Sequence, residues 1–261
     1  VSSYYGIWNA DRARTVFAPT DWAFLFAPVN MTKYMSTEQW GRTHMWSLFK
    51  YLSTMGTELS SDWMDGDVLV NFEGENLTVA IEPEANYFIN GAAVEEADID
   101  ATNGVIHLME EVILPMWAET SLADVVLETP ELASLALALT GEELLLLQEH
   151  NGPFTLLAPT DVDMTTLLPD ANLLLSHLIP GIITRVSPGE NYTTLQGSTI
   201  QIVSEGTISS IRTNETTLAY ISPEGDTVAQ MEFQTIDGGE AELVSNGIVH
   251  QIGTVLLPTT P

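Results

Sequence analysis

The sequence contains no cysteine, and this absence removes three classes of chemistry at once. Disulfide scaffolds, zinc sites with cysteine ligands and thiol catalysis all need a residue that the chain lacks. An extracellular location stays open, because 261 residues are enough for two domains that each bury a core without disulfides.

Basic residues are scarce as well: 7 Lys and Arg stand against 36 Asp and Glu, for a formal net charge of −29. Residues 1–115 carry 17 acids and 5 bases, which gives −12, and residues 116–261 carry 19 and 2, which gives −17. Such a surface repels phosphate backbones and anionic lipids, which argues against nucleic acid as a partner. Such a charge suits a protein at high ionic strength or in a cation-rich wall, where cations bind diffusely. A plain soluble acidic surface explains the charge equally well.

Long apolar runs are also missing. The best candidate, residues 132–147, is interrupted by Thr140-Gly-Glu-Glu143, so the sequence predicts no transmembrane helix. The chain does not open with a basic and then apolar signal segment, and we therefore expect a mature or trimmed product. Residues 259–261 are typical of the start of a Thr/Pro linker.

What the chain does contain is an internal repeat. Residues 103–115, from Asn-Gly through His to Pro, align without a gap with residues 246–258. Upstream of each, Thr-Val-Phe-Ala-Pro-Thr-Asp at 15–21 matches Thr-Leu-Leu-Ala-Pro-Thr-Asp at 155–161. A repeat of this length corresponds to a whole domain and not to a solenoid unit.

The repeat predicts two tandem domains, residues 1–115 and residues 116–258. Helices are expected at 121–127, 130–139 and 142–150, before the second copy, and Ser121 with Asp124 predicts a capping box at the first of them. Nothing similar precedes Thr15, so the first copy either lost its leading helices upstream or is degenerate. The Thr-Asp pair after Ala-Pro, Thr20-Asp21 in the first copy, predicts the N-cap of a following helix.

The first copy also has an insertion at about 28–43. A helix at 43–55 is expected to match one at 172–179, and this alignment places Tyr51 at the position of His177.

Alternating apolar residues predict several strands in each copy, with a longer hairpin at about 205–231 in the second. Asn-Gly pairs such as Asn90-Gly91 predict tight hairpin turns. Helices followed by strands predict an α+β fold, with helices packed on a mostly antiparallel sheet. The expected strands are 16–18, 67–72, 77–81, 87–89 and 105–114 in the first copy, and 155–158, 192–195, 199–203, 207–212, 218–221, 228–233 and 248–257 in the second.

The repeated pattern resembles the fasciclin-1 (FAS1) domain family, and the resemblance covers nearly the whole chain. It implies two tandem FAS1-like domains with a non-enzymatic role in adhesion or matrix assembly, and no cofactor. The matching residues, which the resemblance makes structural, are Thr20, Asp21, Asn103, His107 and Pro115 in the first copy and Thr160, Asp161, His177, Asn246, His250 and Pro258 in the second.

No residue pattern predicts a catalytic or metal site. His107 and His250 lie at equal positions between apolar residues, which favours structural histidines bonded to buried backbone. His177 could approach His250, but two histidines are too few ligands for a typical zinc site. His44 and His150 are expected at the surface or as capping residues.

Clustered acids raise a calcium hypothesis that the sequence does not support further. Residues 62–67 and 95–100 are rich in Asp and Glu, but neither segment has the full EF-hand spacing. With 36 acids in the chain such clusters arise by chance, and diffuse cation binding is the better expectation.

Four Asn-x-Thr sequons are candidate glycosylation sites if the chain is secreted from a eukaryote. They are Asn30, Asn76, Asn191 and Asn214. Thr-rich turns are the alternative explanation. Asn30 and Asn214 fall in inserted segments and are the preferred acceptors.

The aromatic segment 34–46 is a candidate contact surface, or alternatively a helix that packs on the core of the first copy. We expect an extracellular or cell-surface adhesion or matrix protein with protein or glycan partners. The alternative is an accessory subunit docked on a larger complex, including a membrane complex that faces an organelle lumen. A hydrolase is the weakest candidate, because the chain has no Gly-x-Ser-x-Gly motif.

Overall fold

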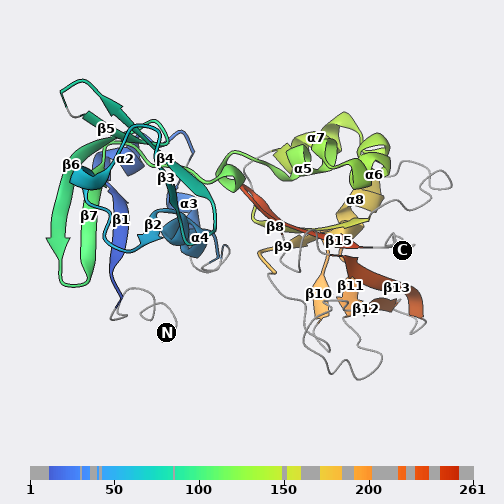
Figure 1. The fold of residues 1–261 in the computed structure, drawn as a ribbon. Helices are drawn as coiled ribbons and strands as arrows, with labels where there is room; N and C mark the ends of the chain where they lie inside the picture. Colours follow the sequence, from blue (N-terminus) through green and yellow to red (C-terminus); the bar gives the residue numbers. More distant parts are fainter. Residues whose placement is uncertain are drawn as a thin grey trace. The chain divides into compact units, whose positions relative to one another are not determined.

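The computed structural model describes residues 12–29, 31–35, 40, 43–84, 86–148, 152–159, 171–183, 191–201, 217–221, 227–234 and 242–252. Contacts divide the chain into two compact units, residues 1–37 with 41–115 and residues 38–40 with 116–261. Each unit combines helices with a β-sheet, so the predicted α+β class is confirmed (Figure 1).

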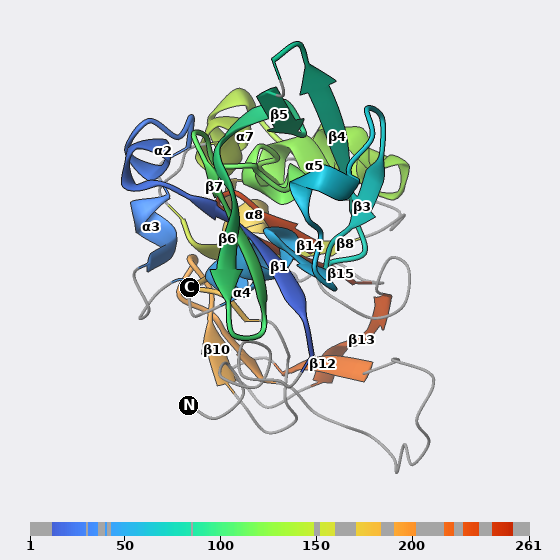
Figure 2. The same ribbon diagram turned by 60° about the vertical axis from the view of Figure 1, so that its left-hand side comes forward.

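The first unit is built on one sheet with the strand order β2-β1-β7-β6-β5-β4-β3. β1 and β7 are parallel and lie side by side in both views, and the other neighbours are antiparallel (Figures 1 and 2). A bridge between Thr54 of β2 and Asn71, just after β3, connects the two edges of the sheet. The strands are β1 (Arg14–Pro19), β2 (Ser53–Met55), β3 (Val68–Val70), β4 (Asn76–Glu82), β5 (Asn86–Ile89), β6 (Ala92–Ala101) and β7 (Gly104–Met109).

Short helices follow β1 in the first unit. Pro19 is its last residue, and the Thr20 side chain then accepts a hydrogen bond from Ala23 N at 3.3 Å. This confirms the predicted N-cap of the next helix, with Asp21 in the first turn. The helices are α2 (Asp21–Leu25), α3 (Thr32–Met35), α4 (Thr43–Tyr51) and the 3₁₀ turn η1 (Ser60–Asp62).

The second unit begins with helices, two of which have side-chain caps at their N-termini. Ser121 and Asp124 form the predicted capping box. Thr140 and Glu143 form a similar reciprocal pair, in which Thr140 N donates to Glu143 Oε2 at 2.7 Å. The helical segments are η2 (Met116–Ala118), α5 (Leu122–Glu128), η3 (Pro130–Leu132), α6 (Ala133–Ala138), α7 (Gly141–Gln148) and, later in the chain, α8 (Ala171–His177).

The sheet of the second unit has the order β12-β13-β15-β8-β9, with β14 paired to β15 and a separate β10-β11 hairpin. β8 and β15 are parallel, as β1 and β7 are. The strands are β8 (Phe154–Pro159), β9 (Leu178–Pro180), β10 (Asn191–Thr193), β11 (Thr199–Gln201), β12 (Thr217–Ile221), β13 (Thr227–Gln234), β14 (Glu242–Val244) and β15 (Gly247–Ile252).

The central pairing has the same register in both units. Phe17 lies opposite His107 in the first unit, and Leu157 lies opposite His250 in the second. In each unit one helix leads directly into an antiparallel strand beside this pair, α4 into β2 and α8 into β9. Both Asn-Gly pairs lie in the hairpin turn before the last central strand, as the sequence predicts.

Several boundaries predicted from the sequence are wrong. The helix expected at 43–55 ends at Tyr51 and the one expected at 172–179 ends at His177, because a strand follows each immediately. The strand expected at 105–114 ends at Met109. β6 was not predicted, because its acidic residues obscure the alternation and its pairing with β7 is irregular between Val94 and Ile99.

The aromatic segment 34–46 is not a contact surface at Tyr34, which is 1 % exposed, and Met31 just before the segment is also buried, at 2 % exposed. His44 is also fully buried, against expectation, and its ring stacks on Tyr34 at 5.1 Å. This burial raises the pKa of Tyr34 and lowers that of Lys33, whose ammonium lies 4.7 Å from the Tyr34 ring centre, to about 8. The alternative of a packing role is therefore confirmed for these residues.

Within the part of the chain that the structure describes, no helix is both long and apolar enough to cross a membrane. His150 lies outside the described residues.

Candidate functional site

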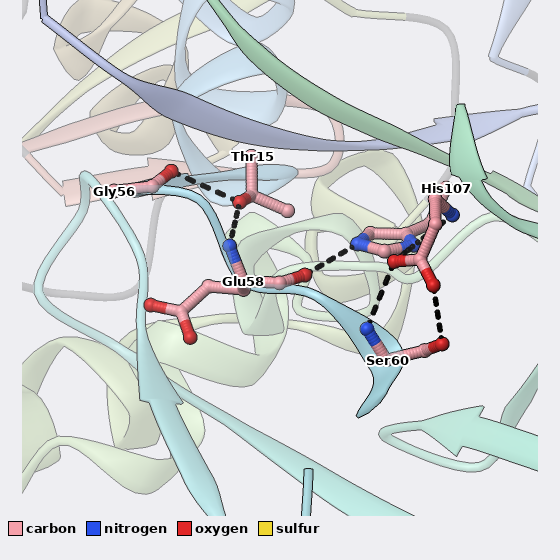
Figure 3. A network of polar contacts seen from close by, with 6 residues as sticks. Thr15, Gly56, Glu58, Ser60 and His107 are labelled. Carbon is pink, nitrogen blue, oxygen red and sulfur yellow. Dashed lines mark hydrogen bonds and ion pairs between the residues drawn. The ribbon is translucent and has the colours of Figure 1, made fainter. Parts of the chain in front are cut away.

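Thr15, near the start of β1, makes two side-chain hydrogen bonds to a loop that lies about 40 residues away in the sequence (Figure 3). Its side chain is fully buried. Oγ1 donates to Gly56 O at 3.0 Å and accepts from Glu58 N at 2.8 Å. One hydroxyl thus satisfies two backbone groups of the loop that follows β2, and it fixes the path of that loop.

His107 of β7 holds the same loop from the other side. Its Nε2 donates to Glu58 O at 2.9 Å, and its Nδ1 accepts from Asp98 N at 3.2 Å. Because a carbonyl only accepts and an amide N–H only donates, these partners fix a neutral ring with its proton on Nε2. Desolvation lowers the pKa of His107, against smaller opposing effects of the Glu58 carbonyl and the Asp98 charge. We call Thr15, Gly56, Glu58 and His107 the threonine–histidine network.

Ser60, His107 and Asp98 lie together, but not in the arrangement of a hydrolase. Ser60 Oγ donates to Asp98 Oδ2 at 2.5 Å, and Ser60 N donates to Asp98 Oδ1 at 2.8 Å. A nucleophilic serine must instead donate to the histidine, which in turn is oriented by the carboxylate. Here the ring nitrogens of His107 hydrogen-bond to backbone groups, and the ring lies against Phe17 and Trp63, with ring centres 5.4 Å and 4.8 Å away. The arrangement can position a loop, and it lacks the serine–histidine bond that acyl transfer needs.

The same network is present in the second unit. Thr155 Oγ1 donates to Gly181 O at 2.7 Å and accepts from Ile183 N at 3.0 Å. His250 Nε2 donates to Ile183 O at 2.6 Å. Desolvation lowers the pKa of His250 as well. Each member therefore has a counterpart of the same role in the first unit.

This correspondence corrects the alignment of His177. Gly56 and Gly181 accept from equivalent threonines, and Val16 and Leu156 pair with Ser53 and Leu178. Counting back from these equivalent residues, the first-unit counterpart of His177 is Leu52 and not Tyr51. Tyr51 instead accepts a hydrogen bond at its hydroxyl from Asn90 Nδ2 at 3.1 Å.

His177 and His250 lie on opposite sides of β8. β8 is the strand between β9, which follows His177, and β15, which contains His250. His177 is buried, with its Nδ1 at 3.2 Å from Ser176 Oγ.

Asn246 connects the closing hairpin to the helices of the second unit. It is fully buried, its Oδ1 accepts from Leu122 N at 2.9 Å, and its Nδ2 donates to Leu147 O at 2.6 Å. It therefore satisfies one orphan donor at the start of α5 and one carbonyl near the end of α7. The backbone carbonyl of Asn246 also accepts a hydrogen bond from Phe154 N. In the first unit the carbonyl of Asn103 accepts from Arg14 N in the same way.

Among the remaining motif residues, only Pro115 lies within the described part of the chain. Pro115 is buried. Thr160, Asp161 and Pro258 lie outside the described residues.

Carboxylates of the acidic clusters accept hydrogen bonds from backbone N–H groups. Asp65 Oδ1 accepts from Ile81 N at 3.0 Å, and Asp67 Oδ2 accepts from Met64 N at 2.8 Å. Asp98, in the second cluster, has a left-handed φ of 61° and binds Ser60. Among the residues that the structure describes, no group of three or more His, Asp or Glu is placed to hold a metal ion.

Two of the four sequons can be located. Asn76 at the start of β4 and Asn191 at the start of β10 are both exposed. Asn30 and Asn214, the preferred acceptors, lie outside the described residues, so glycosylation stays a prediction at all four.

Sequence reasoning missed the loop side of the network. Gly56, Glu58 and Ser60 follow β2 and carry no recognisable motif, and their partners are 38 to 49 residues away. Gly56 and Gly181 each lie three residues after the first residue of a short strand, Ser53 of β2 and Leu178 of β9.

Comparisons with known proteins give a family match in the first unit. Residues 7–115 match the Fasciclin domain. The protein sll1483 of Synechocystis sp. is 32 % identical over 107 residues, which are 41 % of this chain and 58 % of that protein. The transforming growth factor-beta-induced protein ig-h3 of Sus scrofa, and that of Oryctolagus cuniculus, are each 24 % identical over 259 residues, 94 % of this chain and 34 % of theirs.

The chain thus spans little more than half of the cyanobacterial protein and about a third of the mammalian ones. Among solved structures, a FAS1 domain pair from the insect cell adhesion molecule fasciclin I covers 97 % of this chain and 91 % of its own, with a TM-score of 0.40 and 16 % identity. On the family match alone, residues 7–115 contain a fasciclin domain.

Proposed function

We propose that the chain is a non-enzymatic adhesion or matrix protein that acts through the surfaces of two fasciclin-type domains. The observation that carries the proposal is the threonine–histidine network. Of the residues that a hydrolase would use, His107 is bonded to backbone and the Ser60 hydroxyl to Asp98, so that they hold a loop, in a unit that matches the Fasciclin domain. The resemblance of both copies to that family supports the adhesive role.

The proposal includes a second domain of the same kind at residues 116–258. Its support is the recurrence of the parallel central pair with Leu157 opposite His250, and of the Thr155 hydrogen bonds. A setting outside the cytoplasm, with protein or glycan partners, follows from this role.

Attachment of coated beads tests the function. Beads that carry the folded chain are expected to attach to cell surfaces or extracted matrix of the source organism, and beads that carry the heat-unfolded chain are not. Equal attachment by coated and uncoated beads would count against the proposal. Intact-mass and glycopeptide analysis of the native protein would show whether the chain has passed a secretory route.

An accessory subunit docked on a larger complex is the second candidate. Three apolar side chains on and just after α2 favour it: Trp22, Leu25 and Phe26 are 67 %, 69 % and 75 % exposed. Trp22 and Phe26 stack on one another at 5.8 Å, which keeps both at the surface. Recovery of the native protein in a fixed ratio with other subunits would favour this candidate over free matrix exposure.

A further inference from the structure

One face of the sheet in the second unit is covered by the helices α5, α6 and α7 (Figure 1). Leu156 of β8 and Val249 of β15 are buried in a cluster with Leu122, Val126 and Leu135 of those helices. Burial of apolar side chains is the dominant favourable contribution to folding. This helical cover is therefore a main source of stability for that unit.

The first unit has the same face with a thinner cover. The shared register makes Val16 the counterpart of Leu156 and Ile106 that of Val249, and both are only half-buried. Counting from Gly56 and Gly181, Phe49 of α4 corresponds to Leu174 of α8. Phe49 is 40 % exposed, whereas Leu174 is 1 % exposed and belongs to the helix-covered cluster.

A buried cation, Arg14, lies at one end of this face. Arg14 replaces Phe154, which packs against the helical cluster of the second unit. Arg14 is 8 % exposed, its guanidinium carbon lies 4.8 Å from the centre of the Phe72 ring, and its Nε and Nη1 have no hydrogen-bond partner among the described residues. A buried guanidinium without acceptors is unfavourable, and a carboxylate that reached it would gain a charge-assisted hydrogen bond.

The covering segment of the second unit shows what chemistry fits such a face. Residues 116–148 are rich in leucine and contain Asp and Glu but no Lys or Arg. An apolar face that ends in a buried guanidinium is complementary to a helical segment of this composition.

We propose that the face formed by Arg14, Val16, Phe49 and Ile106, the β1–β7 face, binds an acidic, leucine-rich helical segment of a partner protein. The apolar side of the helix packs on Val16, Phe49 and Ile106, and a helix carboxylate pairs with Arg14. This inference rests on the proposed function and deepens it, because it names one interaction surface and the chemistry of its partner.

A synthetic peptide with the sequence of residues 116–148 is a suitable probe, together with a version in which every Asp and Glu is replaced by its amide. Calorimetric titration into the whole chain is expected to show binding that favours the acidic peptide. Phe49→Asp should weaken binding roughly tenfold or more, because it places a charge against the apolar side of the helix. Leu137→Asp is the matched control, since Leu137 is 87 % exposed on α6 of the second unit and is not part of this face, and it should leave binding unchanged.

Arg14→Phe separates the charge from the apolar contact. This variant carries the residue found at the equivalent position of the second unit, so it should fold, as a circular-dichroism melt will check. It is expected to bind both peptides with equal affinity. A persistent preference for the acidic peptide would remove Arg14 from the proposal, and absence of binding to the unmodified chain, or equal weakening by Leu137→Asp, would overturn it.

The outcome is independent of the adhesion test. A chain that binds the peptide but fails to attach beads contradicts the proposed function alone. A chain that attaches beads but does not bind the peptide contradicts this inference alone.

Discussion

At the scale of single residues, the buried polar groups of both units act as ties for the backbone. Thr15 and Thr155 each satisfy one carbonyl and one amide of a loop, and both side chains are fully buried. Removing such a hydroxyl leaves two buried backbone groups unpaired, and each unpaired group costs about 1–3 kcal/mol.

The first prediction concerns these hydroxyls. Thr15→Val and Thr155→Val keep the side-chain shape, and each is expected to lower the free energy of unfolding by about 2–4 kcal/mol. Urea denaturation measured by circular dichroism checks this. Thr78→Val, at an exposed position on β4, is the control and should change stability by less than about 0.5 kcal/mol. Equal effects at all three positions would contradict the structural role of the network.

The second prediction concerns pH. Burial lowers the pKa of His107 and of His250 in the folded chain, so the unfolded chain binds their protons more readily. The stabilisation that comes from the neutral rings is complete above the unfolded pKa of about 6.5. It falls as pH drops below that value and levels off below the folded pKa.

Stability curves of the native chain and of His107→Gln between pH 5 and 8 test this sign. The difference between the two curves isolates the histidine, because Glu75 and Glu242, whose pKa values are raised by burial, contribute with the opposite sign in both proteins. A difference that does not change with pH would show that protonation of His107 is not linked to folding.

At the scale of elements, the central parallel pair needs glycine where it begins. A Cβ at Gly104 would lie 1.8 Å from Arg14 O, and one at Gly247 would lie 2.2 Å from Phe154 O. Gly104 also has a φ of +151°. The third prediction is that Gly104→Ala and Gly247→Ala each destabilise by more than about 2 kcal/mol, because the backbone that they meet cannot move without loss of strand pairing.

Gly141→Ala is the matched control for this prediction. It starts α7 with open space around its Cβ position, so the change should be neutral or stabilising by up to about 1 kcal/mol. Thermal unfolding followed by circular dichroism distinguishes the outcomes. A loss of stability in the control as large as in the other two would point to a general intolerance of the fold.

The elements also show which structure could be predicted from the sequence. The capping box at Ser121, the N-cap at Thr20 and the Asn90-Gly91 turn are local, and each is confirmed because a few adjacent residues determine it. β2 and β9 were missed, because three-residue strands directly after a helix give no periodic signal, and their pairing with β1 and β8 joins distant parts of the chain. The loop side of the threonine–histidine network was missed for the same reason.

At the scale of the whole molecule, the charge of −29 is the dominant feature. Acids outnumber bases in residues 1–115 and in residues 116–261, so self-repulsion acts in both parts of the chain. The ion pair of Lys50 with Glu73 at 3.2 Å offsets a small part of it. Added salt screens this repulsion over a Debye length that shortens from about 30 Å at 0.01 M to about 3 Å at 1 M.

The fourth prediction follows from this charge. The midpoint of thermal unfolding should rise by roughly 2–8 °C between 0.01 M and 1 M NaCl, which corresponds to about 1–2 kcal/mol of relieved repulsion. NaCl and KCl should act equally, because diffuse screening depends on ionic strength and not on the identity of the cation. Millimolar CaCl₂ in 1 M NaCl should add little, whereas a further large rise would indicate a specific calcium site and would contradict diffuse cation binding. A midpoint that is insensitive to salt would show that the acids are spaced widely enough for their repulsion to be negligible.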